Sequence, residues 1–251
     1  MCMACSILVA VSAVGLSSRQ AANKAAYRQK NVLLAAGLIS DGQPISNSDV
    51  AKMFDEKVQV KLVNLETGDY DESTDAKEYD QIKASGDPAL SVPAPENSSR
   101  IARLPKLAQV FLVMEGDQVS KVVIPIEGYG LWGTLYGFLA LEKDTKTVQG
   151  ITYYDQIETP GLGGEVSNPK WKALWKGRLA YDESWKPAIK VIKGVAGSPD
   201  QDPHHIDGLS GATITSNGVS HMMDFWLGEH GFGPYLKKFR EGAASGQARS
   251  S

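Results

Sequence analysis

Residues 109–126 read QVFLVMEGDQVSKVVIPI, and this stretch decides the fold. Its two apolar runs flank residues 115–118, EGDQ, where a glycine among polar residues is typical of a hairpin turn. Residues 134–141 and 148–154 repeat the pattern, with a polar connection between them. Two successive hairpins predict an antiparallel sheet, and helical segments around them make the fold class α+β.

Helices are predicted on both sides of these strands. Residues 17–36 have a helix-favouring composition and end at Gly37, which suits a C-cap. A short helix should begin near Ser48, and Asn168 with Pro169 forms an N-cap and first-turn pair that starts another. These helices would flank the sheet.

The predicted elements divide the chain into four parts. Residues 58–65 alternate as a strand should, and residues 188–192 form a further strand. Residues 71–100 are polar, carry three prolines and are expected to be an irregular connection. The four parts are an N-terminal transmembrane helix at 1–18, a juxtamembrane helix with an N-terminal α/β lobe at 19–100, the main sheet domain at 101–240, and a flexible tail at 241–251.

Composition excludes several classes of function. The chain has 251 residues and a net charge of −3, and its basic residues are not clustered, so we do not expect nucleic acid binding. Cys2 and Cys5 precede the folded body, which therefore has no thiolate metal site. His204 and His205 point opposite ways on an extended segment, so we expect an exposed loop and no metal.

Residues 2–16 are apolar or small and suggest a membrane anchor. About twenty apolar residues are needed to cross a bilayer, so a signal peptide is the alternative, and an anchor lacking its first residues would explain the shortness. The four basic residues between 19 and 30 would by themselves keep the following domain in the cytoplasm. We expect a retained anchor in the lipid bilayer.

Residues 207–215, DGLSGATIT, carry the strongest functional signal. Gly208 and Gly211 allow close backbone approach, and Ser210 and Thr213 supply hydroxyl groups. The following helix, predicted at residues 216–228, would offer free N–H groups and its positive dipole end. The stretch therefore predicts a phosphate site, although an ordinary helix cap is the alternative. The same helix should turn inward four side chains, those of Val219, Met222, Met223 and Trp226.

This stretch resembles the attachment motif of the covalent-FMN-binding domain, Asp-x-x-Ser/Thr-Gly-Ala-Thr-x-Thr. The resemblance implies that the last threonine, Thr215, is esterified to the phosphate of one FMN per chain. It also implies that the rest of the motif binds the cofactor. These residues are Asp207, Leu209, Ser210, Gly211, Ala212 and Thr213.

A second loop, YYDQIETPGLGGEV at residues 153–166, is similar to the Glu-Thr-Pro-Gly-Leu-Gly loop of two related flavoprotein families. One is the family of C subunits of the sodium-translocating NADH:quinone reductase, which the chain resembles over nearly its whole length. The other comprises the equivalent subunits of the Rnf complex, and Gln156 favours the first family only weakly.

The resemblance implies a membrane-anchored electron carrier that relays electrons from NADH to ubiquinone within a sodium-translocating respiratory complex. Its partners would be the other subunits and a flavin transferase acting in trans. The location implied is the bacterial inner membrane, with a single membrane span and the main domain in the periplasm. A Rnf-type subunit and an FMN-binding sensor without a relay role are the alternatives.

The two loops suggest how a flavin ring would be held. We expect Glu158, Thr159, Gly161 and Leu162 to contact the ring, partly through backbone N–H groups. Trp132, together with Tyr129, would form one wall, unless these aromatics only close the core. Lys193 would balance the phosphate charge, unless it is simply solvated.

Overall fold

The computed structural model of the chain describes residues 20 and 22–244. The predicted transmembrane segment, residues 1–18, and the tail from residue 245 lie outside this part. Within the described residues, no helix combines the length and the apolar character needed to cross a membrane.

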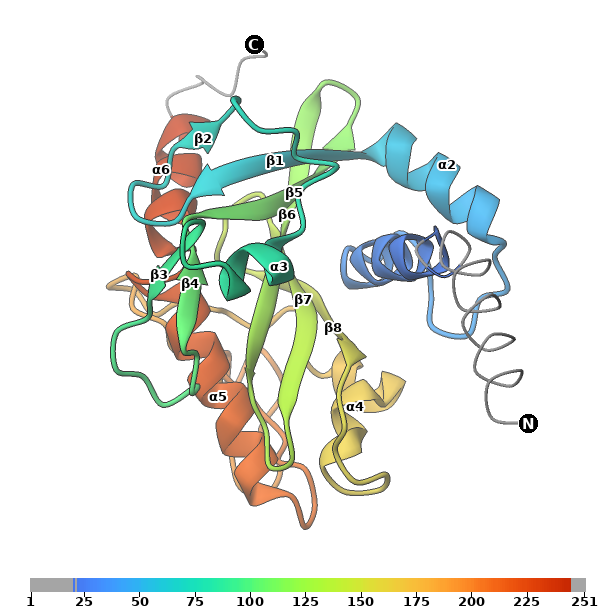
Figure 1. Cartoon of the computed structure of the whole chain (residues 1–251). Coiled ribbons are helices and arrows are strands. Elements are labelled where there is room, and N and C mark those ends of the chain that lie inside the picture. Colours follow the sequence, from blue (N-terminus) through green and yellow to red (C-terminus); the bar gives the residue numbers. More distant parts are fainter. Residues whose placement is uncertain (1–19, 21, 245–251) are drawn as a thin grey trace, which may run out of the picture.

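A six-stranded antiparallel sheet forms the centre of the molecule (Figure 1). In spatial order its strands are β2 (Tyr70–Asp71), β1 (Val58–Asn64), β5 (Leu107–Glu115), β6 (Gln118–Tyr129), β7 (Thr134–Glu142) and β8 (Val148–Asp155). Two small pairs accompany it: antiparallel β3 (Ser91–Pro93) with β4 (Arg103–Pro105), and parallel β9 (Lys190–Val191) with β10 (His205–Ile206).

Helices surround this sheet. They are α2 (Asn47–Lys57), α3 (Gln81–Gly86), the 3-10 helix η1 (Gly163–Ser167), α4 (Pro169–Ala173), α5 (Thr213–Leu227) and α6 (Gly233–Ala244), preceded by a helix at residues 22–35.

The predicted α+β class and antiparallel sheet are confirmed. The strands β5 to β8 are the two expected hairpins, joined edge to edge in chain order. The strand expected at 58–65 pairs with β5 along its whole length, from Val58 opposite Val113 to Asn64 opposite Leu107. A strand that we assigned to the N-terminal lobe is therefore part of the same sheet.

Alternation along β6 gives the sheet two buried faces. Val122 and Ile124 point to one face and belong to the hydrophobic cluster that includes α5. Val123, between them, points to the other face and packs in the cluster formed with residues 32–39 and α2. Figure 1 shows the blue N-terminal helix apart from the orange α5, with the long strands between them.

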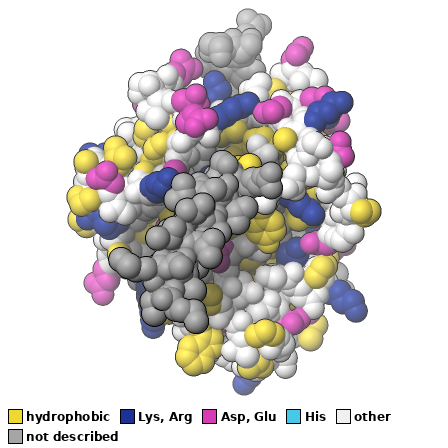
Figure 2. All heavy atoms as spheres, turned by 45° about the vertical axis from the view of Figure 1, so that its right-hand side comes forward, with side chains coloured by type: hydrophobic (Ala, Val, Ile, Leu, Met, Phe, Trp, Pro, Cys, Tyr) yellow, Lys and Arg dark blue, Asp and Glu magenta, His cyan; other side chains and the backbone are white. Residues whose placement is uncertain are grey.

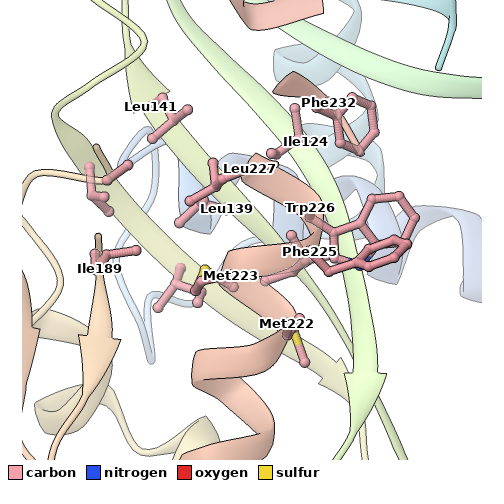
Figure 3. Close-up of a cluster of buried hydrophobic side chains, with 14 of the residues drawn as sticks. Ile124, Leu139, Leu141, Ile189, Met222, Met223, Phe225, Trp226, Leu227 and Phe232 are labelled. Atoms are coloured by element: carbon pink, nitrogen blue, oxygen red, sulfur yellow. The ribbon is translucent and has the colours of Figure 1, made fainter. Parts of the chain in front are cut away.

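The helix α5 provides much of the larger cluster (Figure 3). Its four predicted inward residues are fully buried: Val219, Met222, Met223 and Trp226. The indole Nε1 of Trp226 donates to the backbone oxygen of Glu127 in β6 at 2.6 Å. A Cβ atom at Gly218 would overlap the carbonyl oxygen of Tyr129, so the helix backbone lies directly against β6.

The helix α5 starts three residues before the predicted position. Its N-cap residue is Ala212, with no hydrogen bond from a capping side chain among the described residues. The hydroxyl of Ser216 does not cap the helix, because it lies inside the first turns and accepts a hydrogen bond from the N–H of Leu209 at 3.1 Å. A serine that we expected near the start thus has another partner.

The C-terminal helix was missed by the sequence analysis. The helix α6 buries Tyr235 and Leu236 against the cluster of α5 and continues to Ala244. It therefore occupies the first four residues of the segment that we expected to be a flexible tail. Gly233 and Pro234 at its start were the available signal, since proline is favoured in a first helical turn.

Short elements also occupy the expected irregular connection. Between residues 71 and 100 lie α3 and β3. Outside this segment, α2 is capped by Ser46, two residues before Ser48, where we expected the helix to begin. The strand expected at 188–192 is reduced to the two residues of β9. Elements this short contain too few residues for a periodic pattern.

Charges on the described surface are mixed in sign. On the face in Figure 2, basic and acidic side chains lie interspersed. Some of them tie elements together, as Lys172 of α4 does with Asp41 at 2.7 Å and Lys238 of α6 with Asp69 at 2.5 Å.

Glu127 is a partly buried acid on the sheet face opposite α5. It shares a small cavity with Arg28, Tyr136 and Tyr154, and desolvation raises its pKa from the ordinary 4.5 to about 7. Because the pKa is higher in the folded protein, the folded state binds more protons between these values. Stability is therefore lost as the pH rises through this window, by at most about 3 kcal/mol.

We predict that Glu127→Gln flattens this dependence. The variant should gain stability relative to the parent chain at about pH 8, and should gain little at about pH 4.5. Urea unfolding of both proteins at the two pH values measures the difference in unfolding free energy between variant and parent. The contributions of the other titrating groups are common to both proteins and cancel in this difference. An equal difference at both pH values would contradict the prediction.

Candidate functional site

Three segments meet at one end of the sheet. The first is the loop at residues 130–133 between β6 and β7, and the second is the loop at 156–163 after β8. The third is the first turn of α5, which follows the DGLSGATIT stretch. Hydrogen bonds to one side chain, that of Glu158, join all three.

The carboxylate of Glu158 is buried, with 5% of its surface exposed, and accepts three hydrogen bonds. Its Oε1 accepts from the backbone N–H groups of Leu131 and Trp132, each at 2.9 Å. Its Oε2 accepts from the hydroxyl of Thr215 at 2.6 Å. A buried carboxylate is costly unless it is satisfied in this way.

Two glycines leave space for this carboxylate. A Cβ atom at Gly130 would lie 2.6 Å from Oε1 of Glu158. A Cβ atom at Gly163 would lie 2.6 Å from the hydroxyl oxygen of Thr215 and would overlap Oε2 of Glu158. Neither position can carry a side chain unless the carboxylate moves.

The first turn of α5 contains two threonines, of which one is buried and the other is exposed. Thr215 is 1% exposed because its hydroxyl faces Glu158, whereas Thr213, the first residue of the helix, is exposed. Among the described residues no side chain caps this turn, so its N–H groups and positive dipole end are available to an anion. Thr213 is thus the accessible hydroxyl beside a natural phosphate site.

Exposed apolar side chains stand on this turn and on the two loops that meet it. Trp132 is 60% exposed, and its indole Nε1 donates to the hydroxyl of Thr159 at 3.1 Å. Leu162 lies beside Gly211, just before the helix, since a Cβ atom at Gly211 would be 2.9 Å from its Cδ2. The exposed members of this group are Leu131, Trp132, Ile157, Leu162 and Ile214. Such a group is suited to cover a planar apolar ligand.

The early part of the motif shapes the loop. The Oδ1 atom of Asp207 accepts from the N–H of Ala196 at 2.9 Å, and its carbonyl oxygen accepts from Nε1 of Trp171 at 2.9 Å. Leu209 and Ala212 are buried, while Ser210 and Gly211 are exposed. Asp207 and Leu209 therefore hold the loop, and the exposed residues face outward with Thr213.

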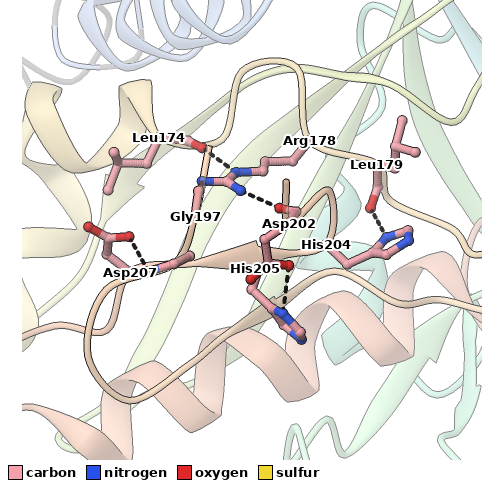
Figure 4. Close-up of polar contacts among 9 residues, drawn as sticks. Leu174, Arg178, Leu179, Gly197, Asp202, His204, His205 and Asp207 are labelled. Atoms are coloured by element: carbon pink, nitrogen blue, oxygen red, sulfur yellow. Dashed lines mark hydrogen bonds and ion pairs between the residues drawn. The ribbon is translucent and has the colours of Figure 1, made fainter. Parts of the chain in front are cut away.

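A buried arginine fixes the chain leading to this motif (Figure 4). Arg178 donates to the carbonyl oxygens of Leu174 at 3.2 Å, Gly197 at 2.7 Å and Asp202. The two histidines of this region have separate partners, as Nδ1 of His204 lies 2.9 Å from the carbonyl oxygen of Leu179, whereas His205 faces Asp202. Both are partly buried, so the expectation of an exposed loop was wrong.

The structure brings together most of the predicted site residues, but not all. Tyr129 lies on the face of β6 opposite α5, where the guanidinium of Arg100 lies 5.1 Å from its ring centre, and its hydroxyl donates to the backbone oxygen of Trp132 at 3.4 Å. Lys193 is exposed and makes no ion pair within the described residues. Three parts of the site were not recognised from the sequence: the Leu131 N–H group, Gly163, and Gln156, whose Oε1 accepts from the N–H of Glu158. The repeated glycines were the only signal for them.

Comparisons with known proteins agree with this geometry. Residues 130–228 match the family model described as the FMN-binding domain. The chain is 47% identical over 242 residues to the C subunit of the Na(+)-translocating NADH-quinone reductase of Vibrio vulnificus strain YJ016, covering 96% of this chain and 92% of the relative. The corresponding C subunit of Pseudomonas aeruginosa is 44% identical over 247 residues, which are 97% of this chain and 94% of that protein. The crystal structure of Shewanella oneidensis NqrC aligns with a TM-score of 0.80 and 34% identity, over 88% of this chain and 99% of that one.

We predict that Gly163→Ala destabilises the fold by about 1–3 kcal/mol, because the added methyl group forces Glu158 and Thr215 apart. The matched control is Gly86→Ala, at the end of α3, where a Cβ atom meets nothing within 4 Å. The control should change stability by no more than about 0.5 kcal/mol. Thermal unfolding of both variants measures the effect, and equal melting temperatures would contradict the assigned geometry.

Proposed function

The chain belongs to the family of C subunits of the Na(+)-translocating NADH-quinone reductases, and we propose that it carries electrons there on an FMN covalently bound at the first turn of α5. It is an FMN-binding subunit of this oxidoreductase and acts with the other subunits of a membrane complex. FMN supplies the chemistry that side chains lack, because it accepts and passes on electrons reversibly.

The attachment residue that we propose is Thr215, the last threonine of the sequence motif. Its hydroxyl lies in the first turn of α5 and donates to the Glu158 carboxylate at 2.6 Å. Thr213 is exposed in the same turn, two residues earlier. The match of residues 207–215 to the attachment motif is the single observation that carries the assignment.

The residues around this turn fit the parts of FMN. The uncapped first turn offers N–H groups to the phosphate, and Ser210 adds an exposed hydroxyl beside it. Trp132 and Leu162 offer apolar surface to the flavin ring. Thr159 and Gly161 belong to the same loop as Leu162. Lys193 follows β9 near the motif and is a solvated cation.

In this proposal the protein contributes binding and orientation. The sheet and α5 form a rigid support, so the apolar side chains keep a constant position relative to the phosphate site. They also exclude water from one side of the ring. Covalent attachment prevents loss of the cofactor, and a flavin transferase acting in trans would form the bond.

We predict that Thr215→Val abolishes covalent flavin, since valine keeps the shape of threonine but lacks the hydroxyl. Thr213→Val should retain it. Each variant is produced together with a flavin transferase, and intact mass and in-gel flavin fluorescence report attachment. Flavin that persists in Thr215→Val and is lost in Thr213→Val would move the assignment to Thr213.

The location is a further part of the proposal. Residues 1–18 would anchor the chain by a single span in the inner membrane, with the FMN domain in the periplasm. The support is the apolar run of the sequence together with the family, whose members belong to a membrane complex. The predicted division of the chain near residue 100 also remains a proposal.

We predict that alkaline phosphatase fused after Ser251 is active in cells, because this enzyme requires the periplasm. A cytoplasmic reporter at the same position should be inactive. The reverse pattern would mean that the basic residues between 19 and 30 determine the orientation. Recovery of active fusion in the soluble fraction would favour a cleaved signal peptide.

A further inference from the structure

A groove of about 340 Å³ lies between the ends of β6 and β7 and the segment at residues 99–103. Ser85 and Gly86, at the end of α3, line it from that helix, and Tyr129 and Tyr136 line it from the sheet. Its volume is within the range of sites for small molecules. The groove is therefore large enough to hold an organic ligand.

Two arginines line this groove without an acidic partner. Arg100 makes no ion pair among the described residues, and its guanidinium lies 5.1 Å from the ring centre of Tyr129. Arg103 donates through Nε and Nη2 to Ser91, at 2.8 and 3.0 Å, and its Nη1 group makes no bond within the described part of the chain. Guanidinium donors thus remain available in the groove.

The segment that carries these arginines also holds an unsatisfied polar group. Ser99 lines the groove and is 1% exposed, and its hydroxyl has no hydrogen-bond partner in the described structure. Arg100, the next residue, has a φ of 57°, in the left-handed region that residues other than glycine seldom adopt. Buried polar groups without a partner and unusual backbone are both concentrated at functional sites.

We infer that this groove binds a small organic oxyanion, with a carboxylate or phosphate head and a planar body. The head would accept hydrogen bonds from the guanidinium groups and from Ser99, since guanidinium groups are suited to such heads. The planar body would pack against the rings of Tyr129 and Tyr136. Residues 156–163 and 207–215 do not line the groove, so this site is distinct from the proposed flavin site.

The site nevertheless adjoins the loop that carries Trp132. Tyr129 and Thr134 line the groove, and they flank this loop at residues 130–133. An occupant would therefore touch both ends of the loop. The inference goes beyond flavin binding, and it does not depend on which residue bears FMN.

The first test uses the chain with FMN attached, so that the flavin site is already occupied. Phenyl phosphate, benzoate, inorganic phosphate and benzyl alcohol are titrated into isotope-labelled protein at about pH 8, and amide chemical shifts are recorded. We expect shifts at residues 85–86, 99–103 and 134–136. An aryl oxyanion should bind more tightly than inorganic phosphate, benzyl alcohol should not bind, and the tighter of phenyl phosphate and benzoate identifies the head.

Several results would overturn the inference. They are no binding of either aryl oxyanion, equal binding of benzyl alcohol, and binding that occurs only when the flavin site is empty. If no FMN can be attached, the proposed function fails, and the same titration of the unloaded chain still decides this inference. Shifts confined to residues 207–216 would then contradict the groove.

The second test assigns the groups. Arg100→Gln should weaken aryl oxyanion binding about tenfold, and Arg100→Lys should recover part of it because it keeps the charge. Ser99→Ala should weaken binding about threefold and stay folded, since the hydroxyl that it removes has no partner. Lys176→Gln is the matched control for the lost charge, because Lys176 is exposed and does not line the groove. Equal effects of Arg100→Gln and Lys176→Gln would contradict the site.

Glu127 provides a variant with the opposite sign. Its carboxyl lines the same groove, and its pKa of about 7 means that it is ionised at about pH 8. An ionised carboxyl repels an anion, so Glu127→Gln should strengthen aryl oxyanion binding at this pH. Weaker or unchanged binding in Glu127→Gln would overturn the inference.

Discussion

The buried carboxylate of Glu158 constrains the whole end of the molecule where the site lies. A charge taken out of water must be matched by donors, and here two loops and one helix supply them. The surrounding chain must come close, so glycines stand at positions 130 and 163, where a side chain would displace the carboxylate. The loops are ordered by this requirement, and their apolar side chains remain outside as available surface.

The sequence predicted the long, regular parts of this structure well. The hairpins of β5 to β8 and the inward face of α5 follow from patterns that extend over many residues. The α6 helix was missed, although Pro234 in its first turn was a signal for it. The start of α5 was misplaced because Ser216, which looks like a cap, binds the N–H of Leu209 instead. The contact between Thr215 and Glu158 joins residues that are 57 positions apart, and a local motif does not contain that information.

The two faces of the sheet serve different purposes. One face carries α5 and the proposed attachment turn, with the sheet as a rigid support. The other face binds the helix at residues 22–35 and α2 through a separate apolar cluster that includes Phe54, Phe111 and Phe138. The family membership explains why such a support is useful, because an electron carrier must keep its cofactor in a fixed position while it meets different partners.

The packing of the N-terminal helix has a mechanical consequence. Val32 and Leu33 are fully buried against the sheet, and the Arg28 guanidinium lies over the rings of Phe111 and Phe138. The N-terminal helix is thus packed against the same sheet that supports the proposed flavin site. A rotation of this helix would carry the sheet and that site with it, so the distance from the site to a neighbouring subunit would depend on the orientation of the helix.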